Sequence, residues 1–211
     1  MTLTGAFLPA GKTLGLGMFW YEDEVKRLEH NQQQMVSEPE TIFYGSSSIR
    51  QWVSLEKDFA DLKPVNLGFG GSTLAACVWF FERIMVNYKP KKLIIYAGDN
   101  DLGDGRHPEE VFIFFQQLTV RATQRFGNIP CYYISLKPSP SRWHLADHFK
   151  FANTLIEHEI ANHLPTWRYI DLFDKMLGAD GLPKKEYFLN DGLHLSTAGY
   201  QLWTDIIKKQ I

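Results

Sequence analysis

Three residue types in this sequence could together activate a serine hydroxyl. A hydroxyl becomes an effective nucleophile when a base removes its proton, and an imidazole acts as that base when a carboxylate fixes its tautomer. Ser47, Asp191 and His194 supply such a set, and Asp191 and His194 are three residues apart. In a turn that enters a helix, this spacing lets the carboxylate reach Nδ1 of the imidazole and leaves Nε2 free to face Ser47. The chemistry that this set suits is acyl transfer through a covalent serine intermediate.

Acyl transfer also needs hydrogen-bond donors for the negative oxygen of the tetrahedral intermediate. The backbone N–H groups of Ser47 and Gly71 are candidates, and the side-chain amide of Asn100 is a third. Glycine suits position 71 because its backbone can approach a substrate closely. We therefore expect an oxyanion hole built from Ser47, Gly71 and Asn100.

The elements that must position these groups follow from the apolar pattern. Five short apolar runs predict strands at Thr41–Gly45, Val65–Phe69, Lys92–Ala97, Pro130–Leu136 and Arg168–Leu172. Longer amphipathic patterns predict helices at Phe19–Val36, Ser48–Asp58, Leu74–Tyr88, Pro108–Phe126, Leu145–Ala161 and Thr197–Lys209. Short strands that are apolar on both faces and alternate with helices indicate a parallel sheet covered on both sides, a three-layer α/β/α domain.

In such sheets, ligand sites form at the carboxyl ends of the strands. Ser47, Gly71 and Asn100 each come shortly after one of the first three strands, and Asp191 to His194 precedes the last helix. Arg142 and Trp143 follow the fourth strand in a proline-rich loop, where substrate contact and loop packing are equal alternatives. The candidate groups are therefore expected at one edge of the sheet.

The same segments resemble the signature blocks of the SGNH/GDSL hydrolases, in the same order and over about residues 41–203. The four blocks are Gly45-Ser46-Ser47, Asn66 to Gly71, Gly98-Asp99-Asn100-Asp101, and Asp191 to His194. The resemblance implies a flavodoxin-like fold with a five-stranded parallel sheet. It also implies Ser47 as nucleophile, Gly71 and Asn100 as oxyanion donors, and Asp191 and His194 as orienting group and base. The function that it implies is that of a lipase, acylhydrolase or esterase.

One position departs from the family pattern. Ser46 stands where the family has aspartate, and three consecutive serines leave the position of the nucleophile open by one residue. Gly45, two residues earlier, favours Ser47. The missing carboxylate keeps open a non-catalytic binding module with a decayed site, and an acyltransferase with the same triad is a further alternative.

Charge and composition exclude other partners. The 22 basic and 24 acidic residues give a net charge of −2, which offers no basic field for nucleic acid or an anionic membrane. We expect a small-molecule ester substrate and no metal or organic cofactor, because His144 and His148 lack a third metal ligand. No repeat or linker interrupts residues 1–211, so a single domain is expected. Met1 to Trp20 has no signal-peptide layout, which makes the cytoplasm the default location.

The amount of chain near the site predicts the acyl group. Long acyl chains need a deep apolar tunnel or a lid, and lids are usually insertions of a dozen or more residues. The connections after the first three strands run quickly into helices, so short acyl groups such as acetyl, on a polar or carbohydrate alcohol, are expected. The expected walls are residues 139–148 and 177–189, which mix aromatic residues such as Trp143 and Phe188 with polar ones.

Overall fold

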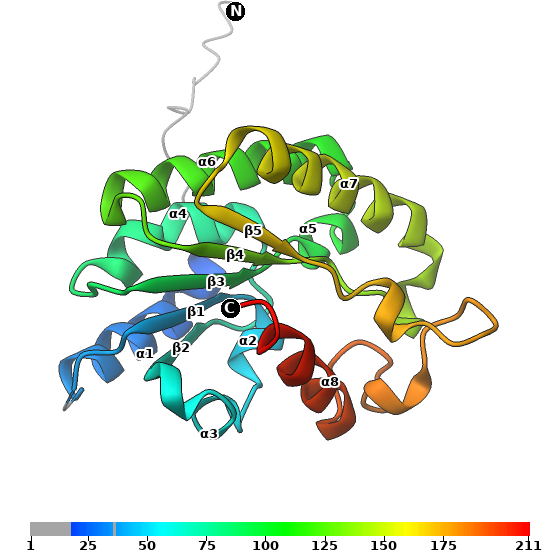
Figure 1. Cartoon of the computed structure of the whole chain (residues 1–211), viewed down its shortest axis with the longest axis horizontal. Helices are drawn as coiled ribbons and strands as arrows, with labels where there is room; N and C mark the ends of the chain where they lie inside the picture. Colours follow the sequence, from blue (N-terminus) through cyan, green and yellow to red (C-terminus); the bar gives the residue numbers. More distant parts are fainter. Residues whose placement is uncertain (1–17, 36) are drawn as a thin grey trace, which may run out of the picture.

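The computed structural model describes residues 18–35 and 37–211 of the chain. Its centre is one sheet of five parallel strands in the order β2-β1-β3-β4-β5 (Figure 1). The strands are β1 (Thr41–Gly45), β2 (Pro64–Gly68), β3 (Lys92–Tyr96), β4 (Cys131–Ile134) and β5 (Trp167–Ile170). This order is that of the flavodoxin-like doubly wound sheets. The predicted fold class is confirmed, and all five strands lie where the apolar runs predicted them.

Helices cover both faces of the sheet, as Figure 1 shows for α6 and α7 on one side and α3 and α8 on the other. The first layer consists of α1 (Glu22–Gln33), α4 (Leu74–Met85), α6 (Pro108–Phe126) and α7 (Ala146–His163). The second consists of α2 (Ser47–Arg50), α3 (Leu55–Asp58) and α8 (Thr197–Ile207). Strand residues alternate between the two cores: Ile42 and Tyr44 pack under the first layer and Phe43 under the second. Burial of both strand faces is what selects the parallel sheet.

Two predicted helices differ from the structure. The segment Ser48–Asp58, expected as one helix, forms the separate helices α2 and α3. The chain breaks between them because the Trp52 side chain, 1% exposed, enters the second core and packs against Phe43. The expected helix Phe19–Val36 is a 3₁₀ turn, η1 (Phe19–Tyr21), followed by α1, and Val36 lies outside the described residues.

One helix of the site was not predicted. The short helix α5 (Asp99–Gly103) begins three residues after the end of β3. Aspartate, asparagine and glycine favour turns over helices because their side chains compete for backbone hydrogen bonds or, in glycine, leave the backbone too free. Helix α5 is therefore stabilised by its tertiary contacts and not by local propensity.

The end of β1 shows why a glycine precedes Ser46 and Ser47. Gly45 has φ of +144°, and a Cβ atom there would collide with the carbonyl oxygen of Tyr96 on the adjacent strand. The chain can turn sharply from β1 into α2 only without a side chain at this position. Only Ser46 lies between the strand and the helix, so Ser47 is held at the carboxyl edge of the sheet.

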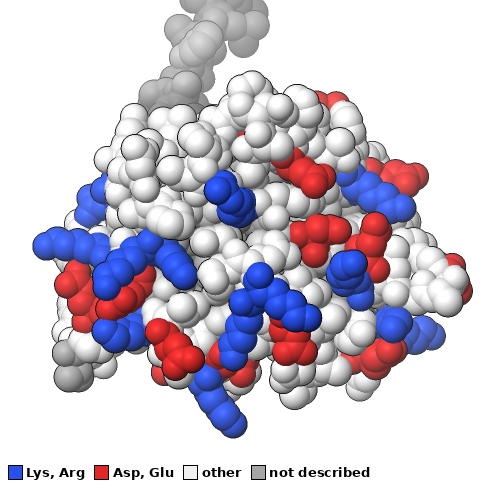
Figure 2. Space-filling view, in the orientation of Figure 1, with Lys and Arg blue, Asp and Glu red and all other residues white. Residues whose placement is uncertain are grey.

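The surface agrees with the balanced composition. Figure 2 shows acidic and basic side chains interspersed on the visible face, with no continuous area of one sign. No helix in the described part of the chain is both long and apolar enough to cross a membrane. Most of the segment Met1 to Trp20, on which the location was predicted, lies outside the described residues.

Candidate active site

The structure distinguishes the three consecutive serines by their surroundings. Ser47 is the first residue of α2, and its Oγ lies 3.2 Å from Nε2 of His194. Ser46 is completely buried, and its hydroxyl has no partner among the described residues. Ser48 is 1% exposed, and its carbonyl accepts a hydrogen bond from Tyr200 in the second core. Of the three, Ser47 is the one whose hydroxyl faces an imidazole.

The loop before α8 brings the imidazole and a carboxylate together. Nδ1 of His194 lies 2.6 Å from Oδ2 of Asp191, and the other carboxylate oxygen accepts the backbone N–H groups of Leu193 and His194. Partial burial opposes the charge of Asp191, but the hydrogen bonds from His194 and these N–H groups outweigh it and lower its pKa to about 2. The carboxylate therefore stays ionised and holds a proton on Nδ1, which leaves Nε2 free to accept one from Ser47.

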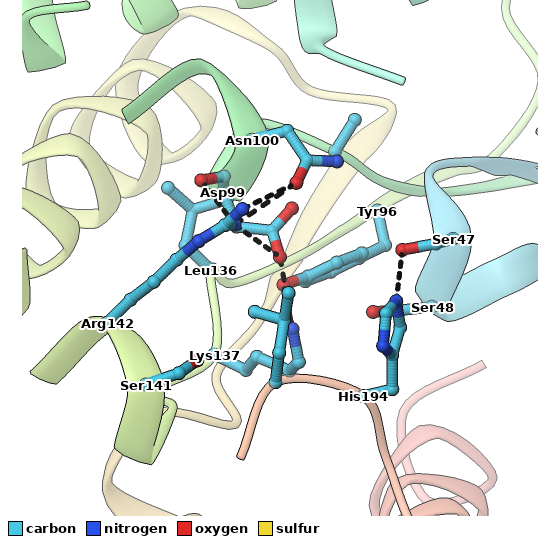
Figure 3. A network of polar contacts seen from close by, with 12 residues as sticks. Ser47, Ser48, Tyr96, Asp99, Asn100, Leu136, Lys137, Ser141, Arg142 and His194 are labelled. Carbon is cyan, nitrogen blue, oxygen red and sulfur yellow. Dashed lines mark hydrogen bonds and ion pairs between the residues drawn. The ribbon is translucent and has the colours of Figure 1, made fainter. Parts of the chain in front are cut away.

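The three expected oxyanion donors lie on the segments that follow β1, β2 and β3. The N–H groups of Ser47 and Gly71 have no acceptor among the described residues. The Asn100 amide donates one hydrogen to the Ser72 carbonyl at 3.0 Å, which leaves its second hydrogen free. Figure 3 shows the nitrogen of this amide on the side turned toward Ser47. The three donors come from α2, the loop after β2, and α5, and their convergence on one oxygen atom remains a prediction.

Asp101 holds the loop that contains Gly71. Its buried carboxylate accepts the N–H groups of Leu74 and Ala75 at the start of α4, and it pairs with Arg106 at 2.9 Å. Burial raises the pKa of Asp101 to about 6, although these partners favour its charged form. Asp101 therefore caps α4, the helix that follows the Gly71 loop.

Arg142 and Trp143 lie in the 3₁₀ turn η3 (Pro140–Leu145) and contact protein groups. Arg142 donates to Oδ1 of Asn100 and to the carbonyl of Asp99. Trp143 is half-buried and stacks on Phe173 with ring centroids 6.4 Å apart. These contacts favour the packing alternative, and substrate contact by either residue remains a prediction.

A buried ion pair beside the site was missed from the sequence. Lys137 and Asp99 are 2% and 6% exposed, and Nζ of Lys137 lies 3.0 Å from Oδ2 of Asp99. Burial opposes the charge of Asp99, but the charges of Lys137 and Arg142 outweigh it and lower its pKa. The signal available in the sequence was a lysine directly after the apolar run of β4, where a parallel strand end faces the site.

His144 and His148 are four residues apart, at the junction of η3 and α7. Both are exposed, one in η3 and one in the first turns of α7. Within residues 18–35 and 37–211, no group of three or more histidine, cysteine or acidic side chains is arranged to hold a metal ion.

A parallel α/β sheet with serine, imidazole and carboxylate hydrogen-bonded in one chain at its carboxyl edge is an arrangement typical of serine hydrolases. Residues 41–202 match the GDSL-like lipase/acylhydrolase family, so the chain belongs to that family. The resemblance read from the four sequence blocks is thereby confirmed. A comparison with curated proteins gave no match.

Solved structures share the fold at low sequence identity. A Streptococcus pneumoniae protein provisionally described as a platelet activating factor is 20% identical, with a TM-score of 0.80 over 97% of this chain and 99% of that chain. A provisionally assigned acylhydrolase from Bacteroides fragilis is 19% identical, with a TM-score of 0.73 over 85% and 91% of the two chains. A GDSL-like lipase from Bacteroides thetaiotaomicron is 20% identical, with a TM-score of 0.72 over 88% and 95%.

Proposed function

We propose that this protein is a serine ester hydrolase in which Ser47 attacks the carbonyl carbon of an ester. His194 takes the hydroxyl proton at Nε2 and then gives it to the leaving alcohol, so that an acyl-serine forms. Water attacks the acyl-serine in the second half of the reaction, with His194 again as the base. The carboxylic acid leaves and the serine hydroxyl is restored. Asp191 fixes the tautomer of His194 and stabilises the imidazolium that forms in each half-reaction.

The observation that carries this proposal is the continuous chain from Asp191 through His194 to Ser47. Its two contacts measure 2.6 Å and 3.2 Å between heavy atoms. The second is at the long end of hydrogen-bond length, as is common for nucleophile and base before substrate binds. A non-catalytic site would not require a hydroxyl, an imidazole and an ionised carboxylate to be hydrogen-bonded in one chain.

The rival function is a binding module, and its best support is that Ser46 replaces the aspartate that the family has beside the nucleophile. Covalent labelling with a fluorophosphonate separates the two, because the reagent requires an activated serine. We expect intact-mass analysis to show one adduct per chain and peptide mapping to place it on Ser47. The buried neighbours Ser46 and Ser48 serve as the internal comparison and should stay unlabelled. Absence of an adduct in folded protein would favour the binding module.

We further propose short acyl groups, such as acetyl on a polar or carbohydrate alcohol, as the substrate class. Little chain is available for a lid: one residue joins β1 to α2, residues 69–73 join β2 to α4, and Ala97 and Gly98 join β3 to α5. A cavity of about 720 Å³ lies between α1, α3 and the edge strand β2, and neither Ser47 nor His194 lines it. The site itself is open, since the Asp191 side chain is 48% exposed.

One expected wall residue does not face a substrate. Phe188 is 6% exposed and packs in the second core, because the strand-like bridge from Phe188 to Leu195 turns its ring inward. Residues 177–189 therefore offer less aromatic surface than their composition indicated. The openness of the site is therefore the remaining support for a polar alcohol as the leaving group.

A p-nitrophenyl ester series tests the acyl preference. We expect kcat/KM to be highest for acetate or propionate and to fall toward decanoate, because an open site cannot bury a long chain. The initial rate is measured as a function of ester concentration, below the critical micelle concentration of each ester. A steady rise from acetate to decanoate would contradict the short-acyl proposal and leave the proposal of an ester hydrolase intact.

A further inference from the structure

Asn100 has a side chain whose orientation is determined by its neighbours. Its Oδ1 accepts two N–H groups of Arg142, both at 3.1 Å, and its Nδ2 donates to the Ser72 carbonyl at 3.0 Å. A flipped amide would turn its NH2 group toward the guanidinium, donor against donor, and its oxygen toward a carbonyl. The amide therefore has one stable orientation, with its remaining N–H at the carboxyl edge.

The Arg142 side chain reaches this position from a different element. Figure 3 shows it extending from η3 toward Asn100 and Asp99, on the opposite side of Tyr96 from the Ser47–His194 pair. The guanidinium also donates to the carbonyl of Asp99 at 2.9 Å, and the side chain is only 19% exposed. Three hydrogen bonds to two consecutive residues of α5 fix its plane.

The buried ion pair leaves the charge of Arg142 available. Lys137 takes Oδ2 of Asp99 at 3.0 Å, whereas the nearest guanidinium nitrogen is 3.8 Å from that oxygen. Two cations and one carboxylate leave one positive charge in excess in this cluster. A guanidinium bound to an amide oxygen polarises the amide and makes its N–H groups stronger donors. The excess charge thus lies one amide away from the position where an oxyanion would form.

The backbone of α5 leaves room for the Arg142 guanidinium because residue 103 is a glycine. A Cβ atom on Gly103 would lie 2.7 Å from Cζ of Arg142, so a methyl group there would displace it. The same turn η3 also holds the loop of the triad, because the Ser141 N–H and hydroxyl both donate to the carbonyl of Gly192 at 3.1 Å. One short turn therefore contacts the donor Asn100 on one side and the loop of Asp191 and His194 on the other.

We propose that Arg142 is a positioning residue of the reaction, one that orients and polarises the Asn100 amide so that its free N–H binds the oxyanion. This inference rests on the proposed ester hydrolysis. It assigns Arg142 a role through Asn100 and not through the substrate. The role requires both the charge of the guanidinium and its position against Gly103.

A double-mutant cycle tests the proposal on the full chain with p-nitrophenyl acetate. We expect Arg142→Ala to lower kcat by about 10–10²-fold, less than removal of an oxyanion donor itself, with little change in KM. In an Asn100→Ala background, Arg142→Ala should lower kcat by less than about threefold further. The effects of substitutions at residues that act through one another are not additive. Arg142→Lys, which keeps the charge without the paired N–H groups, should recover part of kcat. Arg168→Ala, at the amino end of β5, is the control and should leave turnover unchanged.

Gly103→Ala provides a second variant that keeps the arginine. We expect it to lower kcat as Arg142→Ala does and to add little in the Arg142→Ala background, provided that thermal unfolding shows each variant to be folded. Full additivity of Arg142→Ala and Asn100→Ala, or a raised KM at unchanged kcat, would overturn the role of Arg142 and favour substrate contact. No turnover and no fluorophosphonate adduct in the wild-type protein would overturn the proposed function itself, and this role with it.

Discussion

Ser47→Ala is expected to reduce kcat for p-nitrophenyl acetate by about 10⁴–10⁶-fold, as loss of the nucleophile does in serine hydrolases. No other hydroxyl among the described residues is placed within hydrogen-bond distance of Nε2 of His194. The substitution removes one hydrogen bond at a partly exposed position, which contributes about 1 kcal/mol to stability. Kinetics at saturating substrate, together with thermal unfolding, would measure both effects.

The matched controls for this prediction are Ser46→Ala and Ser48→Ala. The Ser46 hydroxyl has no partner among the described residues, and Ser48 contacts Tyr200 through its backbone carbonyl. Both variants should keep activity within the wild-type order of magnitude. If Ser46→Ala or Ser48→Ala is the inactive variant and Ser47→Ala is active, the assignment of the nucleophile is wrong.

Asn100→Ala is expected to lower kcat by about 10²–10³-fold, the usual cost of deleting one oxyanion donor. KM should change far less, because the donor makes its full contact only with the charged oxygen of the transition state. Asn100→Asp should be slower still, since a carboxylate would repel the oxyanion while it keeps its contact with Arg142. Steady-state kinetics of the three proteins check this order.

Asn162→Ala is the matched asparagine control. Asn162 lies exposed near the end of α7, where its amide donates to the carbonyl of His158 in the same helix. Its replacement should leave both kcat and KM at wild-type values. A loss below about threefold in kcat for Asn100→Ala would remove Asn100 from the proposed oxyanion hole, since even one weak donor contributes more.

The architecture of this protein follows from the pattern of apolar residues along its chain. Strands such as Thr41–Gly45 are buried at every position, and only a sheet covered on both faces accommodates them. Alternation with helices then made the sheet parallel, and a parallel sheet gathers its strand ends at one edge. Ser47, Asn100 and His194 could therefore be predicted to lie together, because their order along the chain and the topology rule suffice for that inference.

Predictions from local propensity were wrong where a break between helices or a short helix depends on contacts with residues distant in the sequence. Nothing within Ser48–Asp58 signals that Trp52 will enter a core built by β1 and α8. Helix α5 consists of residues that favour turns, and it forms because Arg142 in η3 and Lys137 after β4 hold it. In both places tertiary packing outweighed the preference of the segment itself.

Which side chains pair with one another depends on the packing of the folded chain. Ser47 meets His194 across 147 residues, Asn100 meets Arg142 across 42, and Asp99 meets Lys137 across 38. A single sequence shows which residue types are present and on which elements they lie, but not which of several charged neighbours at a strand end will meet. Those pairings depend on distances of a few ångströms between elements, and the packing of the two cores sets these distances.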